Sequence, residues 1–375
     1  MNQGFYLTLM MGGFNATPVP ETVIDALLSV QVRTNVGSQG GFQLKLAWGK
    51  NAAIAQLHAS GFFDPRQRVI IAVTVNGSTE VLMDGIITKQ DLTPSSAAGK
   101  STLTLTGLDL TALMDFIDLT GIPYPAMPMF TIVELILAKY ALLGVVPVAI
   151  PPLLALIDNP IERFMKQDGT DYKYITTLAG KVGAVFYLDP GPSPGTSMAY
   201  WGPDLTKLFG GTQPALSINL DSTTTLDSLS FSYDGTLATN YLVTIIEQNT
   251  QIPLVIPLPS IDLIKAPQAA NAATPLKYVQ LKPIASQDPV KAALAGLAKL
   301  FETADVVTAN GQLDVLRYGR VFKARQLCGV RGGGAYYDGL YYVKSVTHDI
   351  KRGEYKQSFT LARGGTGSSV NTVTV

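Results

Sequence analysis

The sequence predicts a mainly β protein of the α+β class, with two antiparallel β-barrels in one chain, an α+β middle section and a helical insertion. Apolar and polar residues alternate with a period of two in two separate regions, one toward each end of the chain, as strands with one buried face require. Between these regions the apolar spacing becomes that of amphipathic helices. A chain of 375 residues is long enough for two or three domains with separate cores.

The first β-region covers residues 1–118. Asn76-Gly77 and Gly40-Gly41 supply turn chemistry between its alternating segments. We expect these segments to form a small antiparallel barrel or sandwich. The predicted strands are residues 5–11, 27–36, 42–48, 68–77, 80–92 and 101–110.

The middle section covers residues 119–215. Apolar residues at helical spacing predict helices over 130–143 and 171–182, the second capped by Asp171. A strand is expected over 182–191. Together these elements predict an α+β domain.

The second β-region comprises residues 216–250 and 312–364, with an insertion at 251–311 between them. The insertion is predicted to contain an extended segment rich in proline and alanine, followed by an amphipathic helix over 289–303. Residues 365–375 are rich in Gly, Ser and Thr and are expected to be a flexible tail. The predicted strands are residues 216–221, 225–234, 240–249, 313–327, 340–350 and 355–363.

The composition favours a protein with large interfaces. Hydrophobic residues make up 47% and charged residues 15% of the chain, where about 25% charged is usual. Much of the surface is therefore expected to be covered by copies of the chain or by partners. A net charge of zero disfavours a general nucleic-acid or anionic-membrane binder.

The chain is expected to fold in a cytoplasm, without disulfides and without inserting into a membrane. It has one cysteine, Cys328, and its N-terminus lacks the features of a signal peptide. The most apolar stretch, residues 130–157, contains charged residues and is interrupted by Pro147 and by Pro151-Pro152. A spanning helix needs roughly 20 uninterrupted apolar residues.

Residues suited to catalysis or metal binding are few. His58 and His348 lie in different regions and only one cysteine exists, so no zinc site, other metal site or cofactor is expected. His348 is expected to have a structural, hydrogen-bonding role. Cys328 could be a nucleophile activated by nearby arginines, but a small buried side chain is the favoured interpretation. The glycines at 332–334 lack the Lys-Ser/Thr of a phosphate-binding loop.

A glycoside hydrolase needs two carboxyl groups flanking a sugar cleft. Glu162, Asp168 and Asp171 are the candidate residues. No cluster of aromatic residues surrounds them in the sequence, so hydrolysis is a minor alternative.

Three segments carry the pattern of a known family. Residues 101–115 contain a strand, a Gly-x-Asp turn at Gly107 and Asp109, and a short helix. Residues 167–191 contain a polar lead-in, an aromatic-rich helix and a strand. The last strands carry the residues His348, Gly353, Tyr355, Phe359, Leu361 and Arg363. In this order the segments resemble the late control D hub proteins of phage baseplates, and the hub portion of type VI secretion spike proteins.

This resemblance implies a structural protein and not an enzyme. It implies two tube-like β-barrels in each chain and a homotrimeric ring, whose six barrels match a sixfold tail tube. The implied partners are a tail tube protein or tube adaptor above, a central spike protein below and other baseplate components. The implied location is the baseplate of a virion or injection particle. Because the sequence contains no spike after the hub, we expect the spike on a separate chain.

Residues 317–363 carry ten basic and three acidic residues, a net charge of +7, so the remainder of the neutral chain carries −7. These charges could lie on solvated strand faces, form a paired interface between subunits, or face a lumen through which DNA or cargo passes. The candidate interface residues flank the Gly353 turn and are Lys351, Arg352 and Lys356.

Two functions of other classes stay open. One is a tail-associated cell-wall hydrolase. The other is a receptor- or carbohydrate-binding tail module, which would be expected to expose aromatic clusters on loops.

Overall fold

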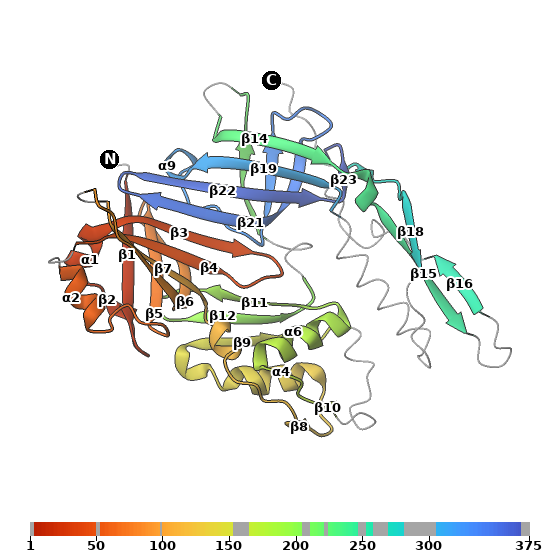
Figure 1. Cartoon of the computed structure of the whole chain (residues 1–375). Helices are drawn as coiled ribbons and strands as arrows, with labels where there is room; N and C mark the ends of the chain where they lie inside the picture. The colour runs from red at the N-terminus through yellow and green to blue at the C-terminus, as the bar shows by residue number, and fades with distance from the viewer. Residues whose placement is uncertain are drawn as a thin grey trace.

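A computed structural model describes residues 4–49, 53–97, 100–152, 165–204, 211–220, 224–246, 253–257, 269–280 and 305–368. Strands make up 50% and helices 17%, which confirms the mainly β class. Figure 1 shows a large sheet, an α+β section below it and a narrow arm of strands that extends away from both.

The first half of the large sheet has the strand order β2-β1-β5-β6-β7-β4-β3, and all its pairings are antiparallel. Its long strands are those predicted from the sequence. Asn76 and Gly77 form the tight turn between two of them, with φ values of 49° and 82°. Two short helices, α1 (Glu21–Ala26) and α2 (Ala53–Ala59), were not predicted. The strands are β1 (Phe5–Gly12), β2 (Thr17–Pro18), β3 (Leu27–Asn35), β4 (Gly41–Ala47), β5 (Arg68–Val75), β6 (Ser78–Thr93) and β7 (Thr102–Asp109).

The second half has the order β14-β19-β22-β21, with β20 paired to β21 and β13 parallel to β20. The β21–β22 hairpin was predicted closely. These strands are β13 (Thr212–Ser217), β14 (Leu226–Tyr233), β19 (Val307–Asp314), β20 (Leu327–Arg331), β21 (Gly339–Lys351) and β22 (Glu354–Arg363).

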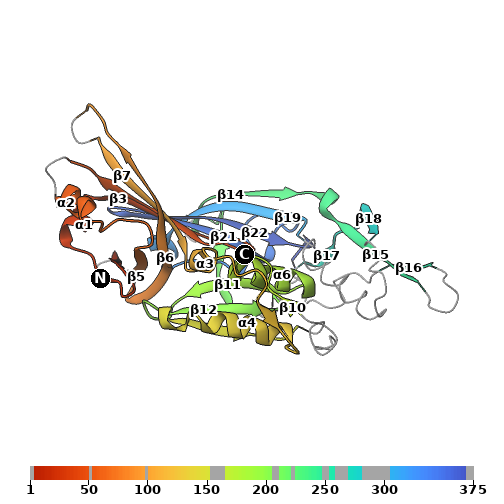
Figure 2. The ribbon, with the colours of Figure 1, turned by 60° about the horizontal axis from the view of Figure 1, so that its bottom comes forward.

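The two halves join through one strand pair. β3 and β21 are antiparallel, from Asn35 opposite Ser345 to Val30 opposite Ile350. All these strands therefore belong to one 13-stranded sheet. Among the described strands, no pairing closes either half into a barrel. Figure 2 shows the ends of β6 and β7 extending beyond the rest of the sheet.

A single hydrophobic core supports both halves. Val32 and Leu44 from the first half and Val346 and Phe359 from the second are all buried in it. Gly107 in β7 makes room for this packing, because a Cβ atom there would lie 2.2 Å from the Phe42 ring. The shared core means that the halves stabilise each other.

The middle section has its own core, in which Ile132 and Ile136 of α4 pack with Leu178 of α6 and with Trp201 of β12. Its main sheet has the order β11-β12-β9. The expected helix 130–143 is divided into α4 and a short 3-10 helix. Helix α6 has the predicted bounds, but its N-cap is Thr170, whose hydroxyl accepts from the Lys173 N–H, and not Asp171. Its elements are α3 (Thr111–Met114), β8 (Pro123–Tyr124), α4 (Met129–Ala138), η1 (Ala141–Leu143), β9 (Val145–Ala149), β10 (Met165–Lys166), α6 (Asp171–Val182), β11 (Val185–Pro190) and β12 (Ser197–Gly202).

The arm differs from the prediction. Residues 240–249 were expected in the second barrel, but β15 (Thr239–Ile246) pairs with β16 (Pro253–Pro257) and β18 (Lys277–Gln280) in a separate sheet. Figures 1 and 2 both show these strands leaving the body of the protein. The predicted extended segment is therefore partly strand. The predicted helix 289–303 lies outside the described residues.

Two further expectations need correction. Residues 313–327 are not one strand: helix α9 (Val315–Tyr318) follows β19, because the Asp314 carboxylate caps it by accepting from the backbone N–H groups of Leu316 and Arg317. The expected flexible tail begins with an ordered strand, β23 (Gly365–Thr366), which is paired with β17 (Asn271–Ala272) and buried. Residues 369–375 lie outside the described residues.

Candidate interaction site

The end of the β21–β22 hairpin carries the three candidate interface residues. Arg352 reaches α1, where its Nη2 donates to the Asp25 carbonyl at 2.7 Å and lies 3.7 Å from the Asp25 carboxylate. The Glu354 carboxylate lies 3.7 Å from the ammonium groups of Lys351 and Lys356. The Asp227 carboxylate lies 3.5 Å from the ammonium group of Lys356. The side-chain exposures are 60% for Lys351, 71% for Arg352 and 35% for Lys356.

The structure thus brings the three cations to one end of the molecule and gives each an acidic partner in its own chain. Solvent-exposed pairs of this kind contribute only about 0–1 kcal/mol. A partner surface could therefore replace these contacts at little cost.

The hairpin is fixed from inside by a buried polar group. His348 Nδ1 lies 2.8 Å from the Tyr355 hydroxyl and 3.2 Å from Gln357 Nε2. Burial lowers the pKa of His348 to about 3, so the imidazole is neutral at physiological pH. Gln357 also holds Phe322 through both its backbone N–H and carbonyl, at 2.9 and 2.7 Å. These contacts support the expected structural role of His348.

Arg363 organises the glycine-rich loop. Its buried guanidinium donates to the carbonyls of Tyr336, Asp338 and Gly367, at 2.8, 3.0 and 3.3 Å. The Asp338 carboxylate accepts from the Gly333 N–H at 2.7 Å. A carboxylate in this position opposes phosphate binding, in agreement with the sequence analysis. The loop instead presents tyrosines, which pack against the aromatic residues of β14.

The candidate catalytic residues that the structure describes are buried or paired with other side chains. Cys328 is fully buried, and burial raises the pKa of its thiol. The Asp171 carboxylate is buried, and it accepts from Lys139, Tyr140 and Gln167 at 2.8–2.9 Å. Asp168 is 78% exposed and lies 3.5 Å from the Lys173 ammonium. Glu162 lies outside the described residues.

A buried ion pair that sequence reasoning missed joins the first half of the sheet to the middle section. Arg68 in β5 makes a bidentate contact with Asp84 in β6, at 2.7 and 2.8 Å. The same guanidinium donates to the carbonyls of Leu143 at 2.7 Å and Gly195 at 3.2 Å. Burial raises the pKa of Asp84, while the hydrogen bonds and charge of Arg68 oppose this shift. The signal in the sequence was Arg68 at the start of a strand with no other charge, and Asp84 within the apolar stretch 81–87.

A second buried arginine, Arg325, joins all three parts of the chain. Its guanidinium lies 4.1 Å from the centroid of the Tyr187 ring and 3.8 Å from Asp189, both in β11. It also donates to the Asn35 carbonyl at the end of β3, at 3.1 Å. Arg325 itself belongs to the segment that precedes β20. The two arginines therefore set the position of the middle section relative to both halves of the sheet.

The described residues contain no cluster of three or more side chains placed to hold a metal ion. Within the same residues, no helix combines the length and apolar character needed to cross a bilayer.

The fold is that of phage tail proteins. A tail protein from Neisseria meningitidis MC58 superposes with a TM-score of 0.61 at 14% identity, covering 97% of this chain and 98% of that one. The 43 kDa tail protein of prophage MuSo2 from Shewanella oneidensis gives 0.62 at 12% identity, with 96% and 98% coverage. A type VI secretion component from E. coli gives 0.51 at 12% identity, covering 90% of this chain and 73% of that one.

No protein-family model matches the sequence, and no curated protein matches it significantly. The similarity to tail and secretion proteins predicted from the sequence is thus confirmed at the level of the fold.

Proposed function

We propose that this chain is a structural hub in the baseplate of a contractile tail or injection particle. Three copies would form a ring that joins a sixfold tail tube, or a tube adaptor, to a threefold central spike. Other baseplate components would contact its outside. The protein would act by geometry and not as an enzyme, and it would be assembled in the cytoplasm of the producing cell.

The observation that carries this proposal is the β3–β21 pair, which unites two strand-rich halves into one sheet. A chain with two such halves can present six similar units from three copies. Among the described strands, the sheet ends at β14 and at the β1–β2 end. Closing a ring would cover these edges, which otherwise favour uncontrolled association.

In this proposal each half contributes one tube-like barrel. The first would be built from residues 1–118. The second would be built from strands of 216–250 and 312–364, with β19 added and β15 excluded on the evidence of the pairings. Residues 119–215 would form the domain that faces the spike. A partner strand or a neighbouring copy would complete each barrel.

Copy number in the assembled particle tests the proposal. Light scattering of the purified chain is expected to give a trimer, either alone or once its partner is added. Image reconstruction of the particle is expected to show three copies around the axis. A single copy, or six copies, would overturn the ring.

One observation favours the receptor-binding alternative: Tyr336 of the 332–338 loop is exposed next to Tyr233 of β14, and the half-buried Tyr337 packs beside it. Binding of soluble glycans at millimolar concentration, measured by NMR line broadening of these tyrosines, would support it. Clearing of a peptidoglycan suspension would support the hydrolase. We expect neither result.

A further inference from the structure

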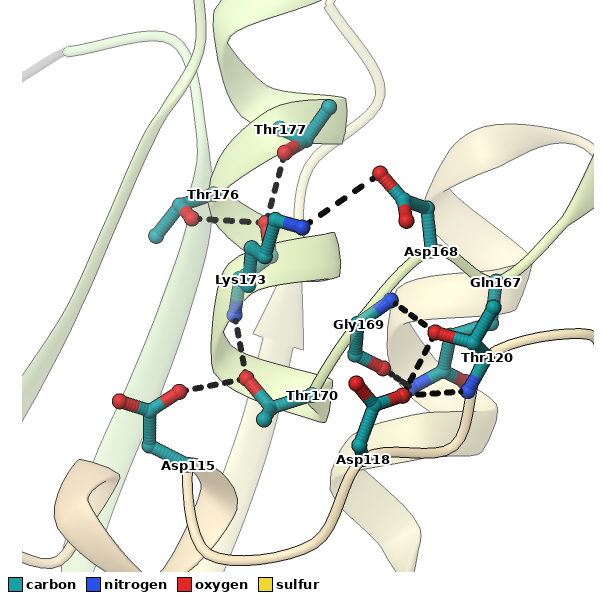
Figure 3. Close-up of polar contacts among 10 residues, drawn as sticks. All are labelled: Asp115, Asp118, Thr120, Gln167, Asp168, Gly169, Thr170, Lys173, Thr176 and Thr177. Carbon is teal, nitrogen blue, oxygen red and sulfur yellow. Dashed lines mark hydrogen bonds and ion pairs between the residues drawn. The ribbon is translucent and has the colours of Figure 1, made fainter.

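Residues 115–122, here called the acidic loop, are held in one conformation by hydrogen bonds to residues 167–170 (Figure 3). The N–H groups of Leu119 and Gly121 donate to the carbonyls of Gly169 and Gln167, at 3.1 and 2.9 Å. The Thr120 hydroxyl accepts from the Gly169 N–H at 2.8 Å and donates to Asp118 at 2.6 Å. Backbone and side-chain hydrogen bonds therefore fix the conformation of the loop.

Three of the four apolar side chains of the loop are exposed, and Leu119 is half-buried. Phe116 is 48%, Ile117 64% and Ile122 38% exposed. An ordered loop that presents apolar groups has little conformational entropy left to lose on binding, and such groups favour contact with protein.

The acidic loop itself carries two anions, Asp115 and Asp118, and no cation. The cations around it are Arg66, 5.5 Å from the Phe116 ring, Lys166, paired with Pro123 at the end of the loop, and Lys173, beside Asp168. The exposed anions are Asp115, Asp118 and Asp168.

A second apolar surface, here called the aromatic surface, consists of Tyr233, Leu276, Tyr278 and Tyr336. The rings of Tyr233 and Tyr336 lie 6.4 Å apart and are 40% and 52% exposed. A Cβ atom on Gly235 would lie 3.2 Å from Leu276 and 3.4 Å from Tyr233, which places these two side chains next to each other. Leu276 and Tyr278 are 70% and 63% exposed.

Cations are in excess on the rim of the aromatic surface. Lys277 lies between Leu276 and Tyr278 in the chain, and Arg331 precedes the glycine-rich loop; both are exposed. Asp234 is the exposed anion beside them. Tyrosine and arginine are enriched at the centres of protein interfaces, so this composition suits a protein partner.

We propose that the acidic loop of one copy docks on the aromatic surface of a second copy. This inference rests on the ring proposed above and specifies the contact that forms it. The two surfaces lie on different elements, one between α3 and β8 and the other at the end of β14 and the start of β18. Figure 1 shows β8 and β18 in different parts of the molecule. A contact between two different surfaces is heterologous, and it produces a closed ring when the rotation between copies closes.

Cross-linking tests the contact directly. The full chain carrying both Ile117→Cys and Tyr336→Cys is oxidised mildly and separated under denaturing conditions. The natural thiol of Cys328 is buried and does not interfere. We expect covalent dimers and trimers, with a ladder that stops at the trimer, and no ladder from either single variant. No ladder, a ladder that continues past the trimer, or dimers of Ile117→Cys alone would overturn the contact.

Sedimentation equilibrium of the full chain measures its strength. Ile117→Glu and Tyr336→Glu are each expected to raise the dissociation constant of the oligomer at least tenfold. Leu142→Glu is the matched control, because Leu142 is 82% exposed and lies outside both surfaces. Equal association of all three variants and the wild type would overturn the contact.

A charge exchange separates specific pairing from general repulsion. Asp168→Lys and Lys277→Glu are each expected to weaken association threefold to tenfold, and the double variant is expected to return within twofold of the wild type. Additive weakening in the double variant would overturn the pairing. If oligomers form but ignore all these changes, the contact is wrong and the hub proposal stands. A single copy in the assembled particle would remove the hub proposal itself.

Discussion

Two arginine–aspartate pairs of this chain, Arg68–Asp84 and Arg352–Asp25, differ mainly in burial. The side chains of Arg68 and Asp84 are 7% and 0% exposed, whereas those of Arg352 and Asp25 are 71% and 73% exposed. Arg68 also donates to three backbone carbonyls, those of Phe14, Leu143 and Gly195. Arg352 donates to one, that of Asp25.

Burial decides what each pair can do. Removing one member of a buried pair leaves an uncompensated charge in a low dielectric, whereas an exposed pair exchanges its partner for water with little change in free energy. The buried pair therefore fixes the architecture, and the exposed pair leaves the hairpin end free to accept a different partner on assembly.

The largest effect is expected at the buried pair. Arg68→Ala leaves the Asp84 carboxylate and three carbonyls without their donor, so we expect it to lower the free energy of unfolding by about 3–5 kcal/mol. Urea denaturation followed by tryptophan fluorescence measures this change.

The matched control is Lys89→Ala, because the pair of Lys89 with Asp91 is exposed, at 67% and 47%. It should cost less than about 0.5 kcal/mol. Removal of both members, Arg68→Ala with Asp84→Ala, should cost less than Arg68→Ala alone, since no unpaired charge remains. Equal losses in Arg68→Ala and Lys89→Ala would contradict the comparison.

A second effect comes from the buried histidine of the hairpin. The pKa of His348 is about 3 in the folded protein and about 6.5 in an unfolded chain. Below pH 6.5 the unfolded state binds a proton that the folded state does not bind until about pH 3. Stability should therefore fall as the pH falls through this window, by at most about 1.4 kcal/mol per pH unit.

His348→Gln keeps a polar side chain at this site but does not titrate. We expect the wild type to lose about 2.3 kcal/mol more than His348→Gln between pH 6.5 and pH 4.5, since the unfolded histidine is already half protonated at pH 6.5. The measurement is urea denaturation of both proteins at several pH values. Parallel pH profiles for the two would show that the histidine is already protonated in the folded state.

Smaller losses are expected at Arg325. Arg325→Ala removes the guanidinium that stacks on Tyr187 and donates to Asn35, and should cost about 1–3 kcal/mol. Arg325→Lys keeps the charge but not the planar stacking, so it should recover only part of this loss. Hydrogen exchange should rise in β11 and at the end of β3 in Arg325→Ala. Unchanged exchange there would mean that the middle section is held by other contacts.

Local patterns predicted the elements whose partners lie nearby in the chain. The β21–β22 hairpin was recovered because both strands alternate around the Gly353 turn, and α6 was recovered from its apolar face and polar start. Most of strand β19 was missed, because residues up to 311 were assigned to the insertion, and the strand contains Asn310-Gly311, a residue pair typical of turns. In the structure these residues lie inside a strand that is paired on both sides, by β14 and β22.

Gly311 shows why the sequence pattern misleads at this position. A Cβ atom there would lie 2.6 Å from the Phe359 ring and 2.8 Å from the Ser228 carbonyl. The glycine therefore allows close packing across the sheet and does not make a turn. This role depends on residues far away in the sequence, which no local pattern contains.

The candidate site was predicted only in part for the same reason. The cations around Gly353 are neighbours in the chain, so their clustering could be foreseen. Arg325 meets Tyr187 and Asn35 only after three parts of the chain have folded together. The exposed apolar side chains of the acidic loop depend on hydrogen bonds to residues 167–170, which the sequence does not pair with them.

The smallest effect on folding, and a large effect on assembly, is expected at the hairpin end. Arg352→Ala should change the free energy of unfolding by less than about 1 kcal/mol, because its contact with Asp25 is exposed.

A triple variant should leave the isolated fold intact but lower the yield of assembled particles. It combines Lys351→Glu, Arg352→Glu and Lys356→Glu. If the hairpin end contacts a neighbouring subunit or the tube protein, this reversal replaces attraction by repulsion at that contact. Salt should affect the variant less than the wild type, because the attraction that salt screens is gone. The control reverses Lys89, an exposed cation on the distal end of β6, and should leave the yield unchanged. Normal particle yield from the triple variant would mean that the hairpin end is a solvated turn, and that its pairs with Asp25, Glu354 and Asp227 persist in the particle.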